Sequence, residues 1–406
     1  MKVLMLSPVH PCPPDRGSKI RIYQSVHRLL QCHEVQGLSF ADPSSVSKNG
    51  GQPESPVCSA VQAVGRARSQ VKATIWSLWS RIPYRSAKFQ DPVFQTHLRK
   101  IVRTGEFDLV WVHFLNMLPF LQDSTLRREL GETTVILDQH NDMERFWAPN
   151  KGHGTYLKRM WAQWNIRQVR QLREKVLHLC DAILSVSEED AKRTREAAPS
   201  DVPVWVVPNG VDLSQFAFGG LSKGGSQSDH ILFVGSMDVE MNIDAVTWFA
   251  QEILPQIRER VSDATFDIVG RSPTSEVQAL GRRDGVHVTG RVDDLQPYYD
   301  RASVAVVPSR LGGGTKLKVP EAMAAGVPVV ATSTGAQGLD VEDGKHLLIA
   351  NKAETFANAV VSLLKDPEHR LLLIKTARDL VETRYSWSGI YDDAIARVEA
   401  LMSRVN

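Results

Sequence analysis

The sequence predicts an α/β protein built from two doubly wound, Rossmann-like domains. Short β-branched runs alternate with longer helical segments along the chain, which is the pattern of parallel sheets covered by helices. The 406 residues are enough for two cores. A Gly- and Ser-rich stretch, GGLSKGGSQS at 219–228, is flexible by composition and separates the halves. We therefore predict domains at 1–212 and 230–384, a linker at 213–229, and a returning C-terminal helix at 385–406.

The overall composition is that of an ordinary globular protein. A net charge of +2 argues against general nucleic-acid binding. Four cysteines are scattered without a CxxC motif, so we expect reduced thiols and a cytoplasmic location. The N-terminal MKVLMLSPVHP predicts a first strand rather than a signal peptide. No apolar run approaches the roughly 18 residues of a membrane-spanning helix.

The first strand, expected at 3–6, leads into a proline-rich loop and then a helix. Ligands of open α/β sheets bind outside the carboxyl ends of strands, and this loop lies at such an end. Arg16 is therefore a candidate contact for an acceptor substrate, and Gly17 a candidate for close approach of a ligand. The alternative is a solvated loop without a binding role.

The segment 57–90 contains six basic residues, two tryptophans and no acidic residue. A basic amphipathic helix with tryptophans is typical of peripheral contact with an anionic membrane or a lipid-linked acceptor. The alternative is a domain helix whose tryptophans lie in the core.

Two further strands, expected at 107–114 and 134–140, carry His113 and His140 at their ends. Side chains at the ends of parallel strands face the ligand-binding edge of the sheet, although either histidine could be a satisfied structural residue. Asn141 and Glu144 follow closely and are candidate acceptor contacts. The helix expected at 154–180 has an apolar stripe that favours a core role, at Tyr156, Met160, Trp164, Val169, Leu172 and Val176.

The second domain is expected to open with strands at 231–235, 266–270 and 285–290. Gly235 ends the first of these strands, and Arg271 and Arg291 directly follow the other two, so all three are candidate donor-binding positions. The loop after Gly235 carries Asp238 and Glu240 but no basic residue, so any phosphate charge must be met elsewhere.

The sequence at 303–335 reads as strand, glycine loop, helix and strand. Val319 precedes a proline and is expected to be extended, so the helix should begin near Pro320. Backbone N–H groups of a glycine loop, a helix N-terminus and nearby cations favour an anion. Glu321 would accept hydrogen bonds from sugar or ribose hydroxyls, so the set predicts a nucleotide-sugar site of Arg310, Gly313, Gly314, Thr315, Lys316, Lys318 and Glu321. The alternative is a tight turn with glycines for packing and solvated lysines.

The run PEAMAAGVPVVATSTGAQGL resembles the donor-binding signature of the GT4-like group 1 family of GT-B glycosyltransferases, and DQHNDMERFW resembles its histidine segment. The resemblance implies two domains facing a central cleft, with the acceptor on the first and the nucleotide sugar on the second. It also implies retention of configuration, with His140 meeting the donor sugar. Where relatives carry a first glutamate in the loop, this chain has Gly313.

The predicted activity is transfer of a hexose-type sugar from a nucleotide-diphosphate sugar to a hydroxyl of a glycan, glycolipid or natural product. We expect His140, Lys318 and Arg310 to be catalytic, His113 to contact the acceptor, and no metal or other cofactor to be needed, since no D-x-D motif is present. Two alternatives remain. One is a sugar-nucleotide 2-epimerase of the same fold, and the other is a non-catalytic nucleotide-sugar-binding subunit.

Overall fold

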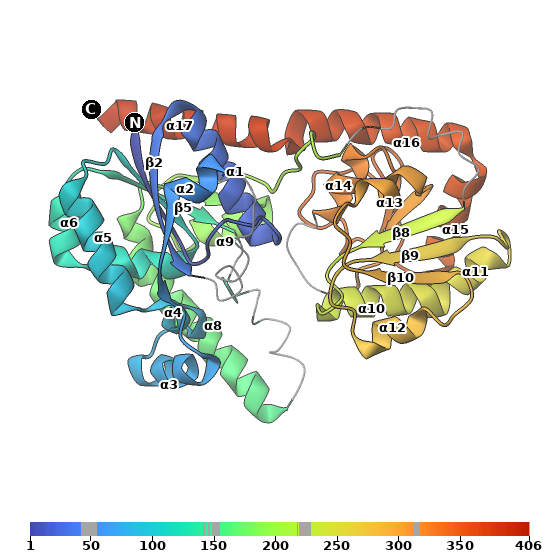
Figure 1. The fold of residues 1–406 in the computed structure, drawn as a ribbon, viewed down its shortest axis with the longest axis horizontal. Coiled ribbons are helices and arrows are strands. Elements are labelled where there is room, and N and C mark those ends of the chain that lie inside the picture. The colour runs from blue at the N-terminus through green and yellow to red at the C-terminus, as the bar shows by residue number, and fades with distance from the viewer. Residues whose placement is uncertain are drawn as a thin grey trace. The chain divides into compact units, whose positions relative to one another are not determined.

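The computed structural model describes residues 1–41, 55–140, 143–144, 147, 155–216, 218, 229–311 and 317–405. The chain divides into two compact units, Met1–Pro208 with Tyr391–Asn406, and Asn209–Ile390. Each unit is a parallel sheet with helices on both faces (Figure 1). The predicted α/β class is confirmed.

The first sheet has the order β3-β2-β1-β4-β5-β6-β7, with all neighbours parallel. Its strands are β1 (Lys2–Ser7), β2 (Glu34–Ala41), β3 (Val61–Arg66), β4 (Leu109–His113), β5 (Thr134–Gln139), β6 (Ala182–Ser185) and β7 (Val204–Val206). The described helices of this unit are α1 (Gly17–Cys32), α2 (Pro56–Ala60), α3 (Gln70–Ser80), α4 (Tyr84–Phe89), α5 (Pro92–Thr104), η1 (Leu115–Gln122), α6 (Ser124–Leu130), α8 (Tyr156–Val176), η2 (Leu177–Leu179) and α9 (Glu188–Arg195).

The second sheet has the order β10-β9-β8-β11-β12-β13, again all parallel. Its strands are β8 (His230–Val234), β9 (Thr265–Val269), β10 (Val286–Gly290), β11 (Val304–Val307), β12 (Val329–Ala331) and β13 (Leu348–Ile349). The described helices are α10 (Glu240–Trp248), η4 (Phe249–Ile253), α11 (Leu254–Arg258), α12 (Ser275–Leu280), α13 (Gln296–Arg301), α14 (Lys318–Ala324), α15 (Ala353–Lys365), α16 (Pro367–Leu380), η5 (Val381–Tyr385) and α17 (Trp387–Val405), which ends in the first unit.

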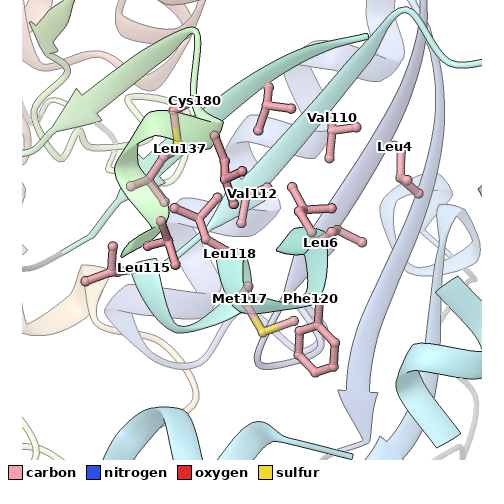
Figure 2. Packing of buried hydrophobic residues seen from close by; sticks show 14 of the residues in the cluster. Leu4, Leu6, Val110, Val112, Leu115, Met117, Leu118, Phe120, Leu137 and Cys180 are labelled. Atoms are coloured by element: carbon pink, nitrogen blue, oxygen red, sulfur yellow. The ribbon is translucent and has the colours of Figure 1, made fainter. Parts of the chain in front are cut away.

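Strand alternation builds the cores on both faces of each sheet. In the second unit, Ile231 and Phe233 of β8 pack with α10, α12 and α15, while Leu232 packs with α14 and α16. In the first unit, η1 packs on one face of the sheet together with α5, α6 and α8. Figure 2 shows its apolar side chains against those of β1, β4 and β5, with labels on Leu115, Met117, Leu118, Phe120, Leu4, Leu6, Val110, Val112 and Leu137.

The segment 57–90 differs from the single basic helix considered from the sequence. It folds as part of α2, the edge strand β3, and then α3 and α4. Trp76 is partly buried, whereas Trp79 is exposed. The strand was missed because an edge strand needs little apolar content, and only Val61 and Val64 of β3 are buried.

The core stripe predicted for 154–180 is also partly wrong. Tyr156 and Met160 at the start of α8 are exposed, and the buried face begins at Ala162 and Asn165. The periodicity is helical throughout, but only the later turns lie over the sheet. None of the helices in the described ranges combines the length and apolar character needed to cross a bilayer.

The expectation of reduced thiols is wrong for two of the four cysteines. Cys12, in the loop after β1, and Cys58, on α2, form a disulfide with a Cα–Cα distance of 5.8 Å. The pairing brings together residues 46 positions apart, because α2 leads into β3 beside β2. His10 Nε2 lies 3.0 Å from the carbonyl oxygen of Val61 and joins the same two segments.

Candidate functional site

The candidate donor site of the second unit lies where its strand order reverses. β8 has β9 on one side and β11 on the other, so the loops after β8 and β11 diverge at this point of the sheet. Such switch points are where open α/β sheets bind ligands. Gly235 directly follows β8, and Arg310 lies shortly after β11.

Two glycines allow the loops at this edge to approach closely. A Cβ on Gly270 would lie 1.6 Å from the carbonyl oxygen of Gly235, so no other residue fits there without moving the backbone. A Cβ on Gly235 would lie 2.9 Å from the amide nitrogen of Asn242 and 3.1 Å from Nζ of Lys318. The absent side chain of Gly235 therefore makes room for a fixed ammonium group.

Lys318 is held at the end of β8 by α10 and by an aromatic ring. Its Nζ donates to Oδ1 of Asn242 at 2.9 Å and lies 3.8 Å from the ring centroid of Phe233. Asn242 in turn donates from Nδ2 to the carbonyl oxygen of Ser236 at 2.9 Å. These contacts place the charge of Lys318 beside the loop that follows β8.

The helix carrying Lys318 begins earlier than predicted. α14 spans Lys318–Ala324 and includes Val319, which we expected to be extended. Pro320 still lies in the first turn, where a missing N–H leaves no intrahelical bond unmade. The expectation failed because a residue before proline only prefers an extended backbone. Burying the side chain of Val319 in the core stabilises the helical conformation by more than this preference opposes it.

Arg271 and Arg310 occupy different surroundings. Nε of Arg271 donates to Oγ of Ser236 at 2.9 Å, which puts a second cation on the loop after β8. Arg310 binds the carboxylate of Asp244 through Nε and Nη2, at 3.2 and 2.5 Å, and lies 4.9 Å from the ring centroid of Trp248. The hydrogen bond to Asp244 raises the pKa of Arg310, and its charge is already compensated.

Glu321 is half-buried in the first turn of α14. Burial raises its pKa to about 7, although the nearby Lys318 ammonium opposes the rise. Tyr299 is buried nearby, and burial followed by the charge of Glu321 raises the pKa of its phenol. The hydroxyl of Tyr299 has no hydrogen-bond partner among the described residues.

The other sequence-predicted positions differ in what the structure says of them. Arg291 directly follows β10 and is exposed. Arg16 and Gly17 are exposed at the start of α1. Glu144 accepts from Arg170 and Arg173 of α8 at 2.9 and 2.8 Å. Outside the described residues lie Asn141, Gly313, Gly314, Thr315 and Lys316.

The two candidate histidines of the first unit are in direct contact. His113 is the last residue of β4 and His140 directly follows β5, which is the neighbouring strand. Nδ1 of His113 lies 2.9 Å from Nε2 of His140. Phe114 has a φ of 70°, which is rare for a residue with a side chain, and its ring centroid lies 4.0 Å from that of His140.

A buried ion pair supports this histidine pair. Arg21 of α1 donates to Oδ1 of Asp138 from Nε at 2.9 Å and from Nη2 at 2.7 Å, and both residues are fully buried. Nη1 of Arg21 also donates to the carbonyl oxygen of Pro208 at 3.0 Å. The hydroxyl of Tyr391, on α17, donates to Oδ2 of Asp138 at 3.1 Å.

The electrostatics keep Asp138 charged and both histidines neutral. Burial alone would raise the pKa of Asp138, but the charge of Arg21 outweighs it and brings the value to about 2. Burial lowers the pKa of His113 to about 4 against the opposing charge of Asp138. Burial likewise lowers the pKa of His140 well below its ordinary value.

Each ring nitrogen of His113 has a polar neighbour. Its Nε2 lies 3.2 Å from Oγ of Ser25, and its Nδ1 lies 2.9 Å from Nε2 of His140 and 3.5 Å from Oδ2 of Asp138. The remaining nitrogen, Nδ1 of His140, has no hydrogen-bond partner among the described residues.

His113, Asp138 and His140 also satisfy a distance test for a metal site, since one ligand atom of each lies within 4.8 Å of the others. A divalent cation would have to share the carboxylate of Asp138 with the buried guanidinium of Arg21. The ion pair and hydrogen bonds already account for the arrangement, so these residues do not fit a metal-binding role.

Comparisons with known proteins identify the family of this chain. The family described as Glycosyltransferase Family 4 matches residues 55–215, and the family described as Glycosyl transferases group 1 matches residues 228–366. This chain belongs to the GT4-like group 1 glycosyltransferases. It is therefore a glycosyltransferase with the two-domain GT-B fold.

This glycosyltransferase has relatives across most of its length. It is 21% identical over 404 residues to an uncharacterized 44.6 kDa protein in the cps region of Klebsiella pneumoniae, covering 96% of this chain and 98% of that protein. It is 27% identical over 306 residues to a phosphatidyl-myo-inositol mannosyltransferase of Mycolicibacterium smegmatis, covering 74% and 72%.

Solved structures show the same fold at low identity. Sucrose-phosphate synthase from Thermosynechococcus elongatus is 19% identical with a TM-score of 0.71, and the match covers 100% of both chains. Anabaena HepE in complex with UDP and glucose is 14% identical with a TM-score of 0.65, covering 98% of this glycosyltransferase and 100% of HepE.

The sequence of this glycosyltransferase did not predict the residues that position its candidate side chains, His113, His140 and Lys318. Arg21 and Tyr391 lie in amphipathic helices far from His140 in sequence, and nothing in the local pattern joins them. Asn242 was not predicted, because the acidic residues around it gave no sign of a phosphate-binding role. Asp138 offered a signal, because a carboxylate inside a buried strand requires a cationic partner.

Proposed function

We propose that this enzyme transfers a hexose from a nucleotide-diphosphate sugar to a hydroxyl acceptor, with retention of the anomeric configuration. The observation that carries the proposal is the fixed ammonium of Lys318 beside Gly235, at the switch point of the second sheet. Bond cleavage leaves negative charge on the diphosphate, and a preorganised cation stabilises that charge.

The similar proteins support the class of donor and acceptor. HepE binds UDP and glucose, and the mycobacterial relatives are named as mannosyltransferases acting on phosphatidyl-myo-inositol. We therefore favour a hexose donor and a glycoconjugate acceptor. The named relatives are transferases, so neither the epimerase nor the non-catalytic subunit is favoured.

Each candidate residue has a role in this proposal. Lys318 and Arg271 bind the diphosphate with the glycine loop, to which Gly313, Gly314, Thr315 and Lys316 contribute. Arg310 assists after rearranging its pair with Asp244, and the segment at Arg291 contacts the nucleobase. Glu321 is close to half protonated at neutral pH, so it can accept from or donate to a donor hydroxyl.

The first unit supplies the remaining contacts. Nδ1 of His140, which has no partner among the described residues, forms a hydrogen bond with a hydroxyl of the donor sugar. Arg16, His113, Asn141 and Glu144 belong to the acceptor side, and Gly17 leaves room for the donor phosphates at the start of α1. The enzyme needs no metal ion, because lysine, arginine and backbone N–H groups stabilise the leaving group.

Thermal shift with nucleoside diphosphates and nucleotide sugars tests the donor site, since a ligand that binds only the folded state raises the melting temperature. We expect nucleotides of one base to raise the melting temperature more than the others do. Lys318→Ala should abolish this rise. It should also lower turnover at least about tenfold, equivalent to about 1.4 kcal/mol in the transition state. Lys365→Ala, an exposed lysine of α15, is the matched control.

An unchanged shift and turnover in Lys318→Ala would remove the site assignment. The configuration is tested separately, by the proton coupling constant at the anomeric carbon of the first product formed. An inverted product would overturn retention without affecting the donor site. Formation of an epimer in the absence of any acceptor would overturn the transferase proposal.

A further inference from the structure

Helix α3 exposes its apolar side chains and buries its small ones. Val71, Ile75, Leu78 and Trp79 follow helical spacing and form one stripe, and Ile75 and Trp79 are 63% and 76% exposed. Ala73 and Ser77 face the protein instead. A helix whose apolar stripe faces solvent is unsatisfied within its own unit.

The packing of α3 fixes this orientation. Nε1 of Trp76 donates to Oε1 of Gln90 at 2.9 Å, and the guanidinium of Arg68 lies 4.4 Å from the ring centroid of Trp76. Oγ of Ser77 donates to the carbonyl oxygen of Ile82 at 2.8 Å. Turning the stripe inward would break these contacts, so its exposure is a property of the fold.

A second exposed apolar group lies at the start of α8. Tyr156, Leu157 and Met160 are 69%, 75% and 50% exposed. Both helices are tied to α4, since α3 packs on α4 and the backbone N–H of Tyr84 donates to Oδ1 of Asn165 on α8 at 2.9 Å. α3 and the first turns of α8 lie at the same end of the first unit (Figure 1).

The segments that carry the two groups hold charge of one sign. No aspartate or glutamate occurs at 57–90 or at 155–173. The exposed cations beside the apolar side chains are Lys72 and Arg81 for α3, and Lys158 and Arg159 for α8. Apolar side chains ringed by cations complement a surface with anionic headgroups over hydrocarbon, and tryptophan favours that boundary.

We propose that α3 and the first two turns of α8 form a surface that docks on an anionic lipid bilayer. Trp79, Ile75 and Leu157 enter the headgroup region, while the neighbouring lysines and arginines contact lipid phosphates. A protein partner or a second copy of the chain would also cover apolar residues. The uniform positive charge favours lipid, because two copies of this surface would repel each other.

Sedimentation with vesicles tests the proposal. We expect the full chain to bind vesicles of equal phosphatidylcholine and phosphatidylglycerol, and to bind phosphatidylcholine alone at least about tenfold more weakly, since each cation near an anionic surface contributes about fivefold. The variant Ile75→Ser/Trp79→Ser should lose at least about tenfold in affinity, because it removes two inserting side chains. Leu372→Ser, at a 59% exposed position of α16, should bind as the wild type does.

Lys72→Ala/Lys158→Ala should weaken binding and reduce its dependence on salt, with each lysine contributing about fivefold. Circular dichroism checks that each variant is folded. Absence of vesicle binding, equal binding to neutral and anionic vesicles, or a wild-type dimer that Ile75→Ser/Trp79→Ser abolishes would each overturn the proposal. Sedimentation with vesicles needs no donor sugar. A failure to bind vesicles is therefore distinguishable from a failure of the proposed transfer reaction.

Discussion

At the scale of single residues, the charge balance around Asp138 dominates the first unit. The carboxylate accepts from Arg21 and Tyr391 and lies beside two neutral histidines, all of them buried. Removing one partner of a buried ion pair leaves the other without compensation, which costs more than the pair contributes to stability.

Asp138→Asn should therefore destabilise the first unit by about 3–5 kcal/mol, because the guanidinium of Arg21 is left buried and uncompensated. Denaturant unfolding followed by tryptophan fluorescence measures the change. Asp392→Asn is the matched control. Asp392 pairs at the surface with Arg28, which is on α1 as Arg21 is, and surface pairs contribute about 0–1 kcal/mol. Equal losses in the two variants would contradict the account.

Glu321 gives the second unit a pH dependence of opposite sign to that of an ion-paired acid. Its pKa rises from 4.5 to about 7 on folding, so the folded state holds a proton that the unfolded state has released. Stability from this group is present below pH 4.5 and is lost as pH rises toward 7, by about 3 kcal/mol for a pKa change of this size.

Glu321→Gln should remove that decline, which is read as the difference in melting temperature between variant and wild type across the pH range. The exposed Glu354→Gln of α15 is the control. If the wild type and Glu321→Gln keep parallel pH profiles, the pKa of this carboxyl is not raised on folding.

At the scale of elements, close approach of the β8 and β9 loops defines the candidate donor site. The carbonyl oxygen of Gly235 occupies the space that a side chain on Gly270 would need. Gly270→Ala should therefore destabilise the second unit by more than about 3 kcal/mol, because backbone must move. Gly281→Ala is the control, since its φ is −63° and its new Cβ would meet no atom closer than 3.3 Å. Thermal unfolding of both variants makes the comparison, and similar melting temperatures would contradict it.

Elements also show where sequence reasoning succeeds and fails. Buried strands such as β4 and β11 are continuous apolar runs, so their existence and the α/β class could be predicted. The start of α14 was missed because burial of Val319 overrode a local preference. The Cys12–Cys58 disulfide and the Arg21–Asp138 pair join distant segments, and no local pattern carries that information.

At the scale of the whole molecule, α17 is shared between the units. Trp387 lies in the second unit, where its backbone N–H donates to the carbonyl oxygen of Val211, whereas residues from Tyr391 onward belong to the first. Tyr391 is buried with its ring centroid 6.4 Å from that of Trp111 on β4. The last helix of the chain thus contributes a buried side chain to the core of the first unit.

Truncation after Ile390 should lower the melting transition of the first unit and leave that of the second near its wild-type temperature. The reason is that truncation uncovers Trp111 and removes a hydrogen bond to Asp138. Differential scanning calorimetry separates the two melting transitions. The transition whose temperature rises when a nucleoside diphosphate is added is assigned to the second unit. A loss confined to the second unit would contradict this division.

The division of α17 also bears on how the protein is made. During synthesis the first two hundred or so residues emerge well before Tyr391 does, at about 5–20 residues per second. The earlier-emerging unit lacks the ring of Tyr391 against Trp111 and its hydrogen bond to Asp138 until translation has passed residue 391. The first unit can therefore complete its core only after every residue of the second unit, which ends at Ile390, has been synthesised.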